Sequence, residues 1–367
     1  MSGRVVLHLG AMKTGTSFVQ DVLGQHPEQL AAAGVEFLGG FGKQTRAVLD
    51  GLRRTGTEDA LQRWRRLISG APDDRTAVVS MEFLSFASPR QVAGFLEPLR
   101  GREVQVVLTV RDQLRVLPAQ WQSYTRNFGT SSFADYLREV REPRPRKPVG
   151  RAYRTYHRAQ DIVEIVDRWV GRPEVARFDV VTVPPPGAPR EELWERFCRA
   201  IEVTVPGIGL DAVHDNSSLG YASCDALRRV NVHLQDVAPG RYRKVIRPVA
   251  RETLAQLRND ESRPVLDQAA ADYARARNRE VREVLGQRGV GLVGDLGDLP
   301  VDAPAEALSA EVVAPPAEEV LRAARAVWQH AARTARVADT TLSAPQRLDE
   351  IVSDAARMLR GLAEGDR

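Results

Sequence analysis

Residues 8–17, HLGAMKTGTS, hold a lysine, two glycines and several hydroxyl groups at a spacing close to that of a phosphate-binding loop. In ATP-binding loops of the form G-x-x-x-x-G-K-[ST], the lysine follows the second glycine directly. Gly10 and Gly15 keep this separation, but Thr16 stands at the lysine position. The lysine of this segment, Lys13, lies between the glycines instead. The loop still offers amides, a cation and hydroxyl groups, so it predicts an anionic ligand with a shorter phosphate chain than ATP.

The loop stands between a strand-like and a helix-like segment. Residues 4–10, RVVLHLG, form an apolar run that ends in glycine, which is typical of a buried strand. From Thr16 onward the apolar residues follow helical spacing, and Ser17 keeps the hydroxyl position of a phosphate loop. This context predicts that amides at the start of the helix point toward the ligand.

Charge and composition narrow the function classes. The chain has 367 residues, 43% of them hydrophobic and 27% charged, which is typical of a globular protein. Its net charge of +4 is spread among interleaved acids, so a solvated surface is favoured over a nucleic-acid partner. Only four lysines occur, so a lysine inside a glycine loop indicates a function, against the alternative of a simple surface lysine. No membrane span, signal peptide or metal-ligand spacing is found, and a cytoplasmic location is expected.

Alternation of strands and helices predicts the fold class. Strand-like runs recur at 76–81, 104–110 and 175–183, separated by helical patterns at 58–69, 89–99, 113–127 and 158–171. Such alternation predicts an α/β fold with a mostly parallel sheet flanked by helices. Ligands of these folds bind beyond the carboxyl ends of the strands, where Gly10, residues 80–82 and Arg111 are expected.

Composition also predicts the domain organisation. Residues 1–300 are expected to form the α/β domain, which becomes mostly helical after residue 200. Residues 301–316 are rich in alanine and proline and read as a linker. Residues 317–367 carry two amphipathic helical patterns and predict a helical hairpin, which docks on the main domain or on a second subunit of a homo-oligomer.

The segment HLGAMKTGTSFVQDVL resembles the 5′-phosphosulfate loop of the sulfotransferases, because MKTGTS matches the form [PM]-K-[ST]-G-[ST]-[ST]. NSSLG at 216–220 and GVGLVGDLGDL at 289–299 also look like sulfotransferase-like proteins of actinobacteria. The resemblance covers roughly residues 4–300 and implies a P-loop-like fold. It implies 3′-phosphoadenosine-5′-phosphosulfate (PAPS) as sulfuryl donor and 3′,5′-adenosine bisphosphate as product. The donor-binding residues that it implies in the loop are Lys13, Thr14, Gly15, Thr16 and Ser17, and Lys13 would neutralise charge on the leaving phosphate.

A second family signature places an arginine at a strand end and a serine eight residues later, both on the 3′-phosphate. Arg111 directly follows the run 104–110 and fits this signature. At the plus-eight position the chain has Ala119, and Ser123, one helical turn further, is the candidate substitute. A local ion pair between Arg111 and Asp112 is the structural alternative for the arginine.

Glu82 is the candidate general base, because the resemblance implies a glutamate or histidine near the end of this strand. A partly buried carboxylate that faces an acceptor hydroxyl can take its proton. The alternative is that Glu82 opens a short helix and stabilises its dipole. His8 is expected to be a core histidine. For His157 a surface role is favoured over a substrate contact, and it is a candidate base only if Glu82 is not the base. Trp121 is expected in the core and not as an adenine stack.

The resemblance therefore implies transfer of a sulfuryl group from PAPS to a hydroxyl or amine of a small molecule or glycan. Two other functions stay open. One is a P-loop-like nucleotide kinase, which the missing lysine after Gly15 disfavours. The other is a non-catalytic nucleotide-binding or assembly module that uses the C-terminal helices as a partner contact.

Overall fold

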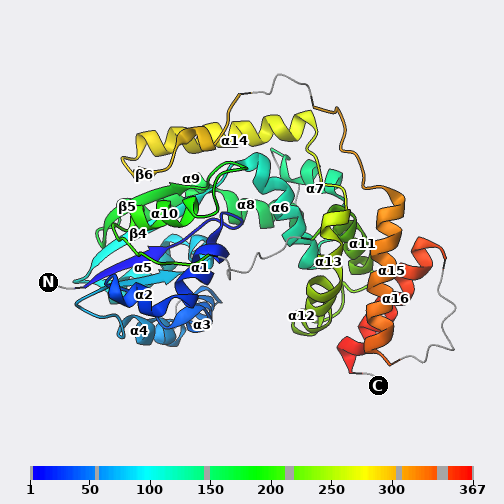
Figure 1. Ribbon diagram of the computed structural model, residues 1–367, viewed down its shortest axis with the longest axis horizontal. Helices are drawn as coiled ribbons and strands as arrows, with labels where there is room; N and C mark the ends of the chain where they lie inside the picture. Colours follow the sequence, from blue (N-terminus) through cyan, green and yellow to red (C-terminus); the bar gives the residue numbers. More distant parts are fainter. Residues whose placement is uncertain are drawn as a thin grey trace. The chain divides into compact units, whose positions relative to one another are not determined.

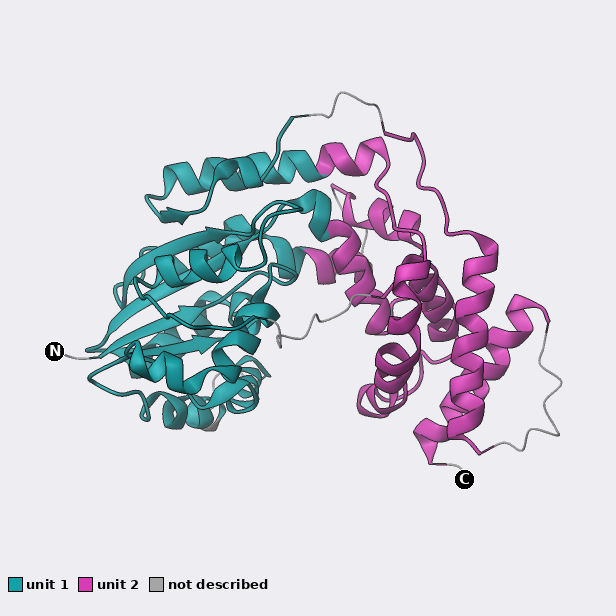
Figure 2. Ribbon diagram, in the orientation of Figure 1, with its two compact units in different colours: residues 1–116, 157–216, 274–303 teal, residues 117–156, 217–273, 304–367 magenta. Residues whose placement is uncertain are grey.

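The computed structural model describes residues 3–53, 58–143, 149–210, 219–302, 308–336 and 346–365. Parts of the basic loop 141–151, of NSSLG and of the linker 301–316 lie outside these ranges. The chain forms two compact units: unit 1 comprises residues 1–116, 157–216 and 274–303, and unit 2 the remainder (Figure 2). Both units draw on the range 1–300, and the linear division into 1–300, 301–316 and 317–367 stays a prediction.

The described part of unit 1 is built on a six-stranded parallel sheet of order β2-β3-β1-β4-β5-β6. The strands are β1 (Arg4–His8), β2 (Val35–Phe37), β3 (Thr76–Ser80), β4 (Glu103–Val110), β5 (Val175–Thr182) and β6 (Gly291–Val293). Because helices connect these strands, the predicted α/β class with a mostly parallel sheet flanked by helices is confirmed (Figure 1).

The strand order switches sides at β1, which pairs in parallel with β3 on one side and with β4 on the other. His8, the last residue of β1, is in register with Ser80 of β3 and Val107 of β4. The segments that follow these three strands therefore emerge next to one another at one edge of the sheet. Such a switch point is where ligands bind in open parallel sheets.

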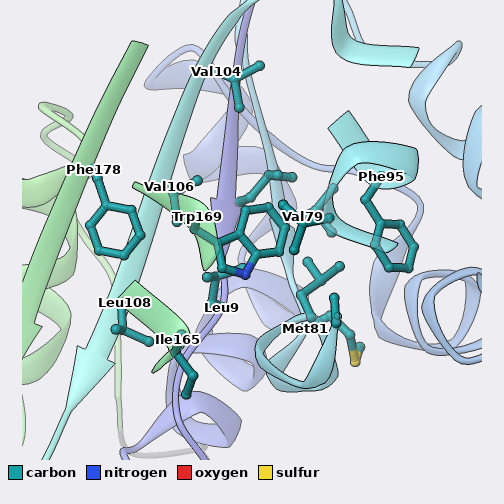
Figure 3. Packing of buried hydrophobic residues seen from close by; sticks show 14 of the residues in the cluster. Leu9, Val79, Met81, Phe95, Val104, Val106, Leu108, Ile165, Trp169 and Phe178 are labelled. Atoms are coloured by element: carbon teal, nitrogen blue, oxygen red, sulfur yellow. The ribbon is translucent and has the colours of Figure 1, made fainter. Parts of the chain in front are cut away.

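Side-chain alternation along the strands divides the core between the two faces of the sheet. On one face, residues such as Leu7, Val79 and Val106 pack with α4, α5, α9 and α14, and Figure 3 shows the Trp169 indole in this layer. On the other face, Val6, Val78 and Val107 pack with α1, α2 and α10. Helices on both faces bury the sheet, which explains its near-continuous apolar strands.

The helices of unit 1 include both predicted and unpredicted segments. They are α1 (Thr16–Gln25), α2 (Pro27–Ala32), α3 (Gly40–Arg53), η1 (Glu58–Leu61), α4 (Gln62–Ile68), η2 (Glu82–Phe86), α5 (Pro89–Leu96), η3 (Glu97–Leu99), α9 (Ile162–Trp169), α10 (Glu192–Ala200) and η6 (Leu296–Asp298). The boundary between the units falls within α6 (Gln113–Arg126), α8 (Arg151–Gln160) and α14 (Gln268–Gln287). The predicted helix 158–171 is divided, because the Asp161 side chain accepts from Glu164 N and starts α9 there.

Unit 2 is helical and includes the C-terminal extension. Its further elements are α7 (Phe133–Val140), α11 (Tyr221–Val232), α12 (Pro239–Pro248), η4 (Val249–Leu254), α13 (Ala255–Leu257), η5 (Arg258–Asp260), α15 (Ala317–Thr334) and α16 (Leu348–Glu364). The α15 and α16 helices pack on each other and on α11, and they bury Val327 and Ile351. The predicted helical C-terminal extension is thus confirmed, while a contact with a second subunit stays a prediction. In the described residues, no helix combines the length and apolar character needed to cross a membrane.

Candidate active site

The loop between β1 and α1 turns through left-handed backbone at three positions. Gly10 has a φ of 48°, Lys13 of 68° and Gly15 of 81°. A Cβ atom at Gly10 would lie 2.3 Å from Thr16 Oγ1, so glycine is required there by close approach as well as by φ. Lysine in this region costs on the order of 1–2 kcal/mol, and such strain concentrates at functional sites.

Thr14 anchors the loop to the end of β4. Its hydroxyl donates to Ala11 O at 2.6 Å and lies 2.7 Å from Thr109 Oγ1. The Ala11 amide in turn donates to Thr109 O at 3.2 Å. Thr14 is fully buried, so its side chain supports the conformation of the loop through these hydrogen bonds.

The start of α1 presents polar groups of two kinds. Thr16 is 2% exposed, and its buried Oγ1 has no hydrogen-bond partner in the described ranges. Ser17 is partly exposed, and Gly15 caps the helix without a side-chain hydrogen bond. Since the first amides of an α-helix have no intrahelical acceptor, this end of α1 can receive an anion.

Arg111 joins the end of β4 to the loop. Its Nη1 donates to Lys13 O at 3.1 Å, while its buried Nε has no hydrogen-bond partner among the described residues. Burial, together with a smaller effect of the Arg115 charge, lowers the pKa of Arg111 to about 10, and the Asp112 carboxylate partly opposes this shift. The guanidinium is therefore charged at neutral pH. The sequence alternative, a local pair with Asp112, is not formed: Asp112 Oδ1 accepts from Asn278 Nδ2 at 2.8 Å and from Leu114 N at 2.9 Å.

A buried chain of amide side chains extends from this arginine to the loop. Asn278 Oδ1 accepts from Gln113 N at 3.0 Å, and Gln113 Nε2 donates to Gln160 Oε1 at 3.3 Å. Gln160 Nε2 then donates to Met12 O at 2.5 Å. With Gln160 only 1% exposed, this chain fixes the carbonyl that immediately precedes Lys13.

Glu82 follows β3 and is the first residue of the 3-10 helix η2. Burial raises the pKa of its carboxyl group, and the Lys13 cation lowers it by a smaller amount. The carboxylate and the loop lysine therefore interact electrostatically, and both lie at the carboxyl edge of the sheet. The helix-start geometry that was the alternative interpretation is present, so the two roles have to be separated by experiment.

His8 is the core histidine that the strand pattern predicts. Its ring is fully buried, with Nδ1 2.7 Å from Ser80 Oγ and Nε2 3.3 Å from Thr109 Oγ1. Burial lowers its pKa to about 3, so the ring is neutral at ordinary pH. Both ring nitrogens are already engaged, which disfavours His8 as the base.

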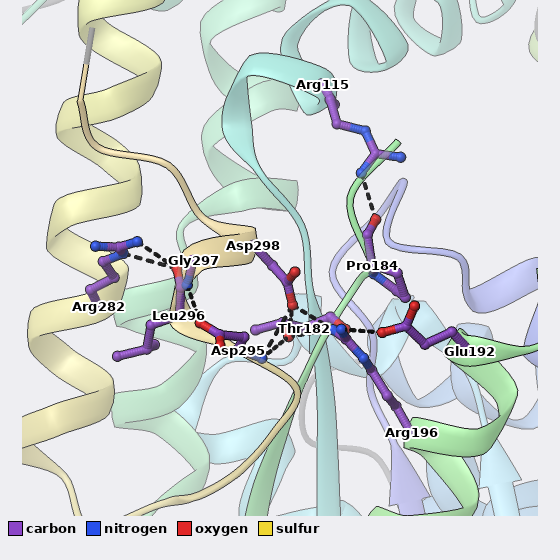
Figure 4. A network of polar contacts seen from close by, with 10 residues as sticks. All are labelled: Arg115, Thr182, Pro184, Glu192, Arg196, Arg282, Asp295, Leu296, Gly297 and Asp298. Atoms are coloured by element: carbon purple, nitrogen blue, oxygen red, sulfur yellow. Dashed lines mark hydrogen bonds and ion pairs between the residues drawn. The ribbon is translucent and has the colours of Figure 1, made fainter. Parts of the chain in front are cut away.

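The segment 291–298 packs beside the end of β5 through the polar network of Figure 4. Arg196 donates to Thr182 O and Thr182 Oγ1, each at 2.9 Å, and pairs with Asp298. Thr182 Oγ1 donates to Asp298 Oδ2 at 2.6 Å. Arg115, one turn after Arg111, donates to Pro184 O at 2.7 Å and so ties the start of α6 to the end of β5. The glycine-rich stretch 289–299 contains the short strand β6 and the single turn η6, and the network holds η6 against the end of β5.

Ser123 and Trp121 belong to unit 2. Ser123 lies in α6 and is 9% exposed, and its carbonyl accepts from Asn127 Nδ2 at 2.8 Å. Its contact with a 3′-phosphate stays a prediction. Trp121 is fully buried and packs on Phe133 with 5.1 Å between ring centroids, as expected for a core residue.

Sequence reasoning missed Thr109, Arg115, Gln160 and Asn278. Two of them carry a readable signal: Thr109 is polar within an apolar strand, and Arg115 follows Arg111 at the i+4 spacing of one helix face. Gln160 and Asn278 contact the site from 148 and 166 residues away in sequence, and local patterns carry no signal of such contacts.

Comparison with known proteins identifies no family for the chain. No family model matches it, and no curated protein matches it. Among solved structures, a sulfotransferase from Alicyclobacillus acidocaldarius is similar, with 16% sequence identity and a TM-score of 0.39. The match covers 66% of this chain and 95% of that one.

Proposed function

We propose that this chain transfers a sulfuryl group from PAPS to a hydroxyl or amine of a small molecule or glycan. The observation that carries the proposal is the arrangement around Lys13. Its carbonyl accepts from Arg111, and its side chain interacts electrostatically with the buried Glu82. A cation for the leaving group, a cation for a second phosphate and a carboxylate base thus belong to three adjacent strand ends.

The polar atoms of the site fit a donor with separate 5′ and 3′ phosphates. Thr16 Oγ1 and Arg111 Nε are buried without a partner among the described residues, a costly state for groups that no ligand contacts. The start of α1, with Thr16 and Ser17, would hold the 5′-phosphate. Arg111 would hold the 3′-phosphate by charge-assisted hydrogen bonds.

The donor supplies an activated sulfuryl group when bound. The chain would stabilise the charge on the leaving group and accept the proton of the acceptor. Lys13 would stabilise the negative charge that develops on the oxygen between sulfur and phosphorus as the bond from sulfur to this oxygen breaks. Glu82 would accept the proton of the acceptor hydroxyl as the new oxygen–sulfur bond forms. Its raised pKa makes Glu82 a stronger base than an exposed glutamate.

Ligand-induced stabilisation tests this function against the two alternatives. We expect 3′,5′-adenosine bisphosphate to raise the melting temperature more than ADP or ATP with magnesium at equal concentration. Selective stabilisation by magnesium ATP would instead support a kinase. The absence of stabilisation by all three nucleotides would overturn the nucleotide site itself.

A further inference from the structure

A pocket of unit 1 that is separate from the loop site, of about 470 Å³, lies between β2, α3 and α4. Four cationic side chains line it, two from each helix: Lys43, Arg46, Arg63 and Arg66. We propose that this α3–α4 pocket binds a sugar-sized polyanion that carries two or more sulfate or phosphate groups. None of its lining residues belongs to the loop site, so the proposal does not depend on the proposed function.

The charge of the pocket exceeds what its own contacts neutralise. Arg63 Nε pairs with Asp50 Oδ2 at 2.7 Å. For the other three cations, the described ranges hold no ion-pair partner, and Glu36 is the one acidic residue in the lining. Each helix also presents its two cations at i,i+3 spacing, which brings like charges onto the same face at a cost in stability. A bound polyanion would remove this repulsion.

The rest of the lining leaves room for a sugar-sized body. Leu38 and Leu67 supply apolar surface, and Gly39 and Gly70 contribute no side chain. A Cβ atom on Gly39 would stand 2.8 Å from Leu67 Cδ1, and the Gly39 φ of 67° also disfavours other residues. A volume of this size is typical of small-molecule sites, in which apolar surface combines with a few placed polar groups.

Buried side chains with hydrogen bonds to the core hold both cation-bearing helices in place. Gln44, next to Lys43, is fully buried; it donates to Leu38 O at 2.9 Å and accepts from Ser80 N at 2.9 Å. Trp64, next to Arg63, is fully buried and donates to Phe95 O at 2.8 Å. The backbone of the pocket is therefore preorganised, which reduces the entropy lost on binding.

Isothermal titration of the full chain with three probes tests the proposal. The probes are a trisulfated heparin disaccharide, glucose 1,6-bisphosphate and neutral lactose. The background is the Lys13→Ala/Arg111→Ala double variant, which removes the loop cations. We expect both anions to bind and lactose not to bind, with affinity falling as salt rises because the contacts are exposed charges. The tighter anion identifies sulfate or phosphate esters as the source.

Adding Arg46→Gln and Arg66→Gln should weaken anion binding at least about tenfold, because each removes charge-assisted contacts. Arg65→Gln is the matched control, since Arg65 lies in the same helix and contacts Glu97 outside the pocket. Failure of both anions to bind, or equal weakening by Arg65→Gln, would overturn the proposal. Slower amide hydrogen exchange in α3 and α4 of the wild-type chain when anion is added is expected too, and unchanged exchange there would also contradict the site.

Discussion

Arg111 Nη1 and the carbonyl oxygen of Lys13 are 3.1 Å apart, and this hydrogen bond joins the end of β4 to the loop after β1. The bond uses one edge of the guanidinium and leaves Nε, which is buried without a partner among the described residues, for a ligand. We expect Arg111→Ala to weaken 3′,5′-adenosine bisphosphate about a hundredfold, corresponding to roughly 2–3 kcal/mol for a lost charge-assisted contact. Adenosine 5′-phosphate, measured by the same titration, should be weakened far less. Equal weakening of both nucleotides would show that Arg111 does not bind the 3′-phosphate.

Lys13 combines a left-handed backbone with a proposed role in charge neutralisation, and the two properties can be separated. Lys13→Ala and Lys13→Gly should both lose most sulfuryl transfer, because each removes the ammonium group. Glycine adopts φ values near 68° without strain, whereas alanine does not. We therefore expect the glycine variant to be more stable than the alanine variant by about 1 kcal/mol in urea unfolding. Full turnover in either variant would remove Lys13 from the mechanism.

Gln160 is expected to act as a positioning residue for the loop. Gln160→Leu removes the donor to Met12 O and leaves this partly buried carbonyl unsatisfied, at a cost of about 1–3 kcal/mol in stability. We also expect the KM for the donor to rise about tenfold while the KM for the acceptor stays unchanged, because Gln160 donates to Met12 O of the proposed donor loop.

Gln105→Leu provides the matched control for Gln160. Gln105 is 1% exposed near the start of β4, where its Nε2 donates to Asp179 Oδ2 at 2.6 Å and to Ala200 O at 2.7 Å. The start of β4 lies at the opposite edge of the sheet from the loop, so this variant should lose stability and keep its donor KM. A similar rise in donor KM for both variants would indicate general destabilisation instead of loop positioning.

Much of this arrangement is predictable from sequence because it depends on local patterns. The apolar runs that become β1, β3, β4 and β5 place Gly10, Glu82 and Arg111 at strand ends. The β2–α3 segment was not predicted. Strand β2 has only three residues, which is too short to show the alternation of a strand, and Gly39, Gly40 and Gly42 are atypical of a helix start. Long-range contacts such as Gln160 to Met12 depend on the packing of the whole unit, which no local spacing encodes.

Glu82 has two candidate roles, and Glu82→Gln separates them. The substitution keeps the shape and the start of η2 but removes the group that accepts a proton. If Glu82 is the base, turnover should fall about 10²- to 10⁴-fold with donor affinity nearly unchanged. Glu97→Gln is the matched control, because Glu97 also opens a short 3-10 helix but is exposed and pairs with Arg65. That control should leave turnover close to wild type.

The pH dependence of the same variant provides an independent test. Burial raises the pKa of Glu82 above its ordinary value of 4.5. Wild-type turnover should therefore fall as pH decreases through this raised pKa, because the carboxylate becomes protonated and can no longer act as a base. The folded chain also binds this proton more tightly than the unfolded chain, so the stability that Glu82 contributes is present at low pH and lost as pH rises through its folded pKa. Glu82→Gln should therefore gain stability relative to wild type as pH rises, measured by urea unfolding across the acidic range. A Gln variant that keeps full turnover and the acidic limb of the wild type would exclude Glu82 as the base and make His157 the next residue to substitute.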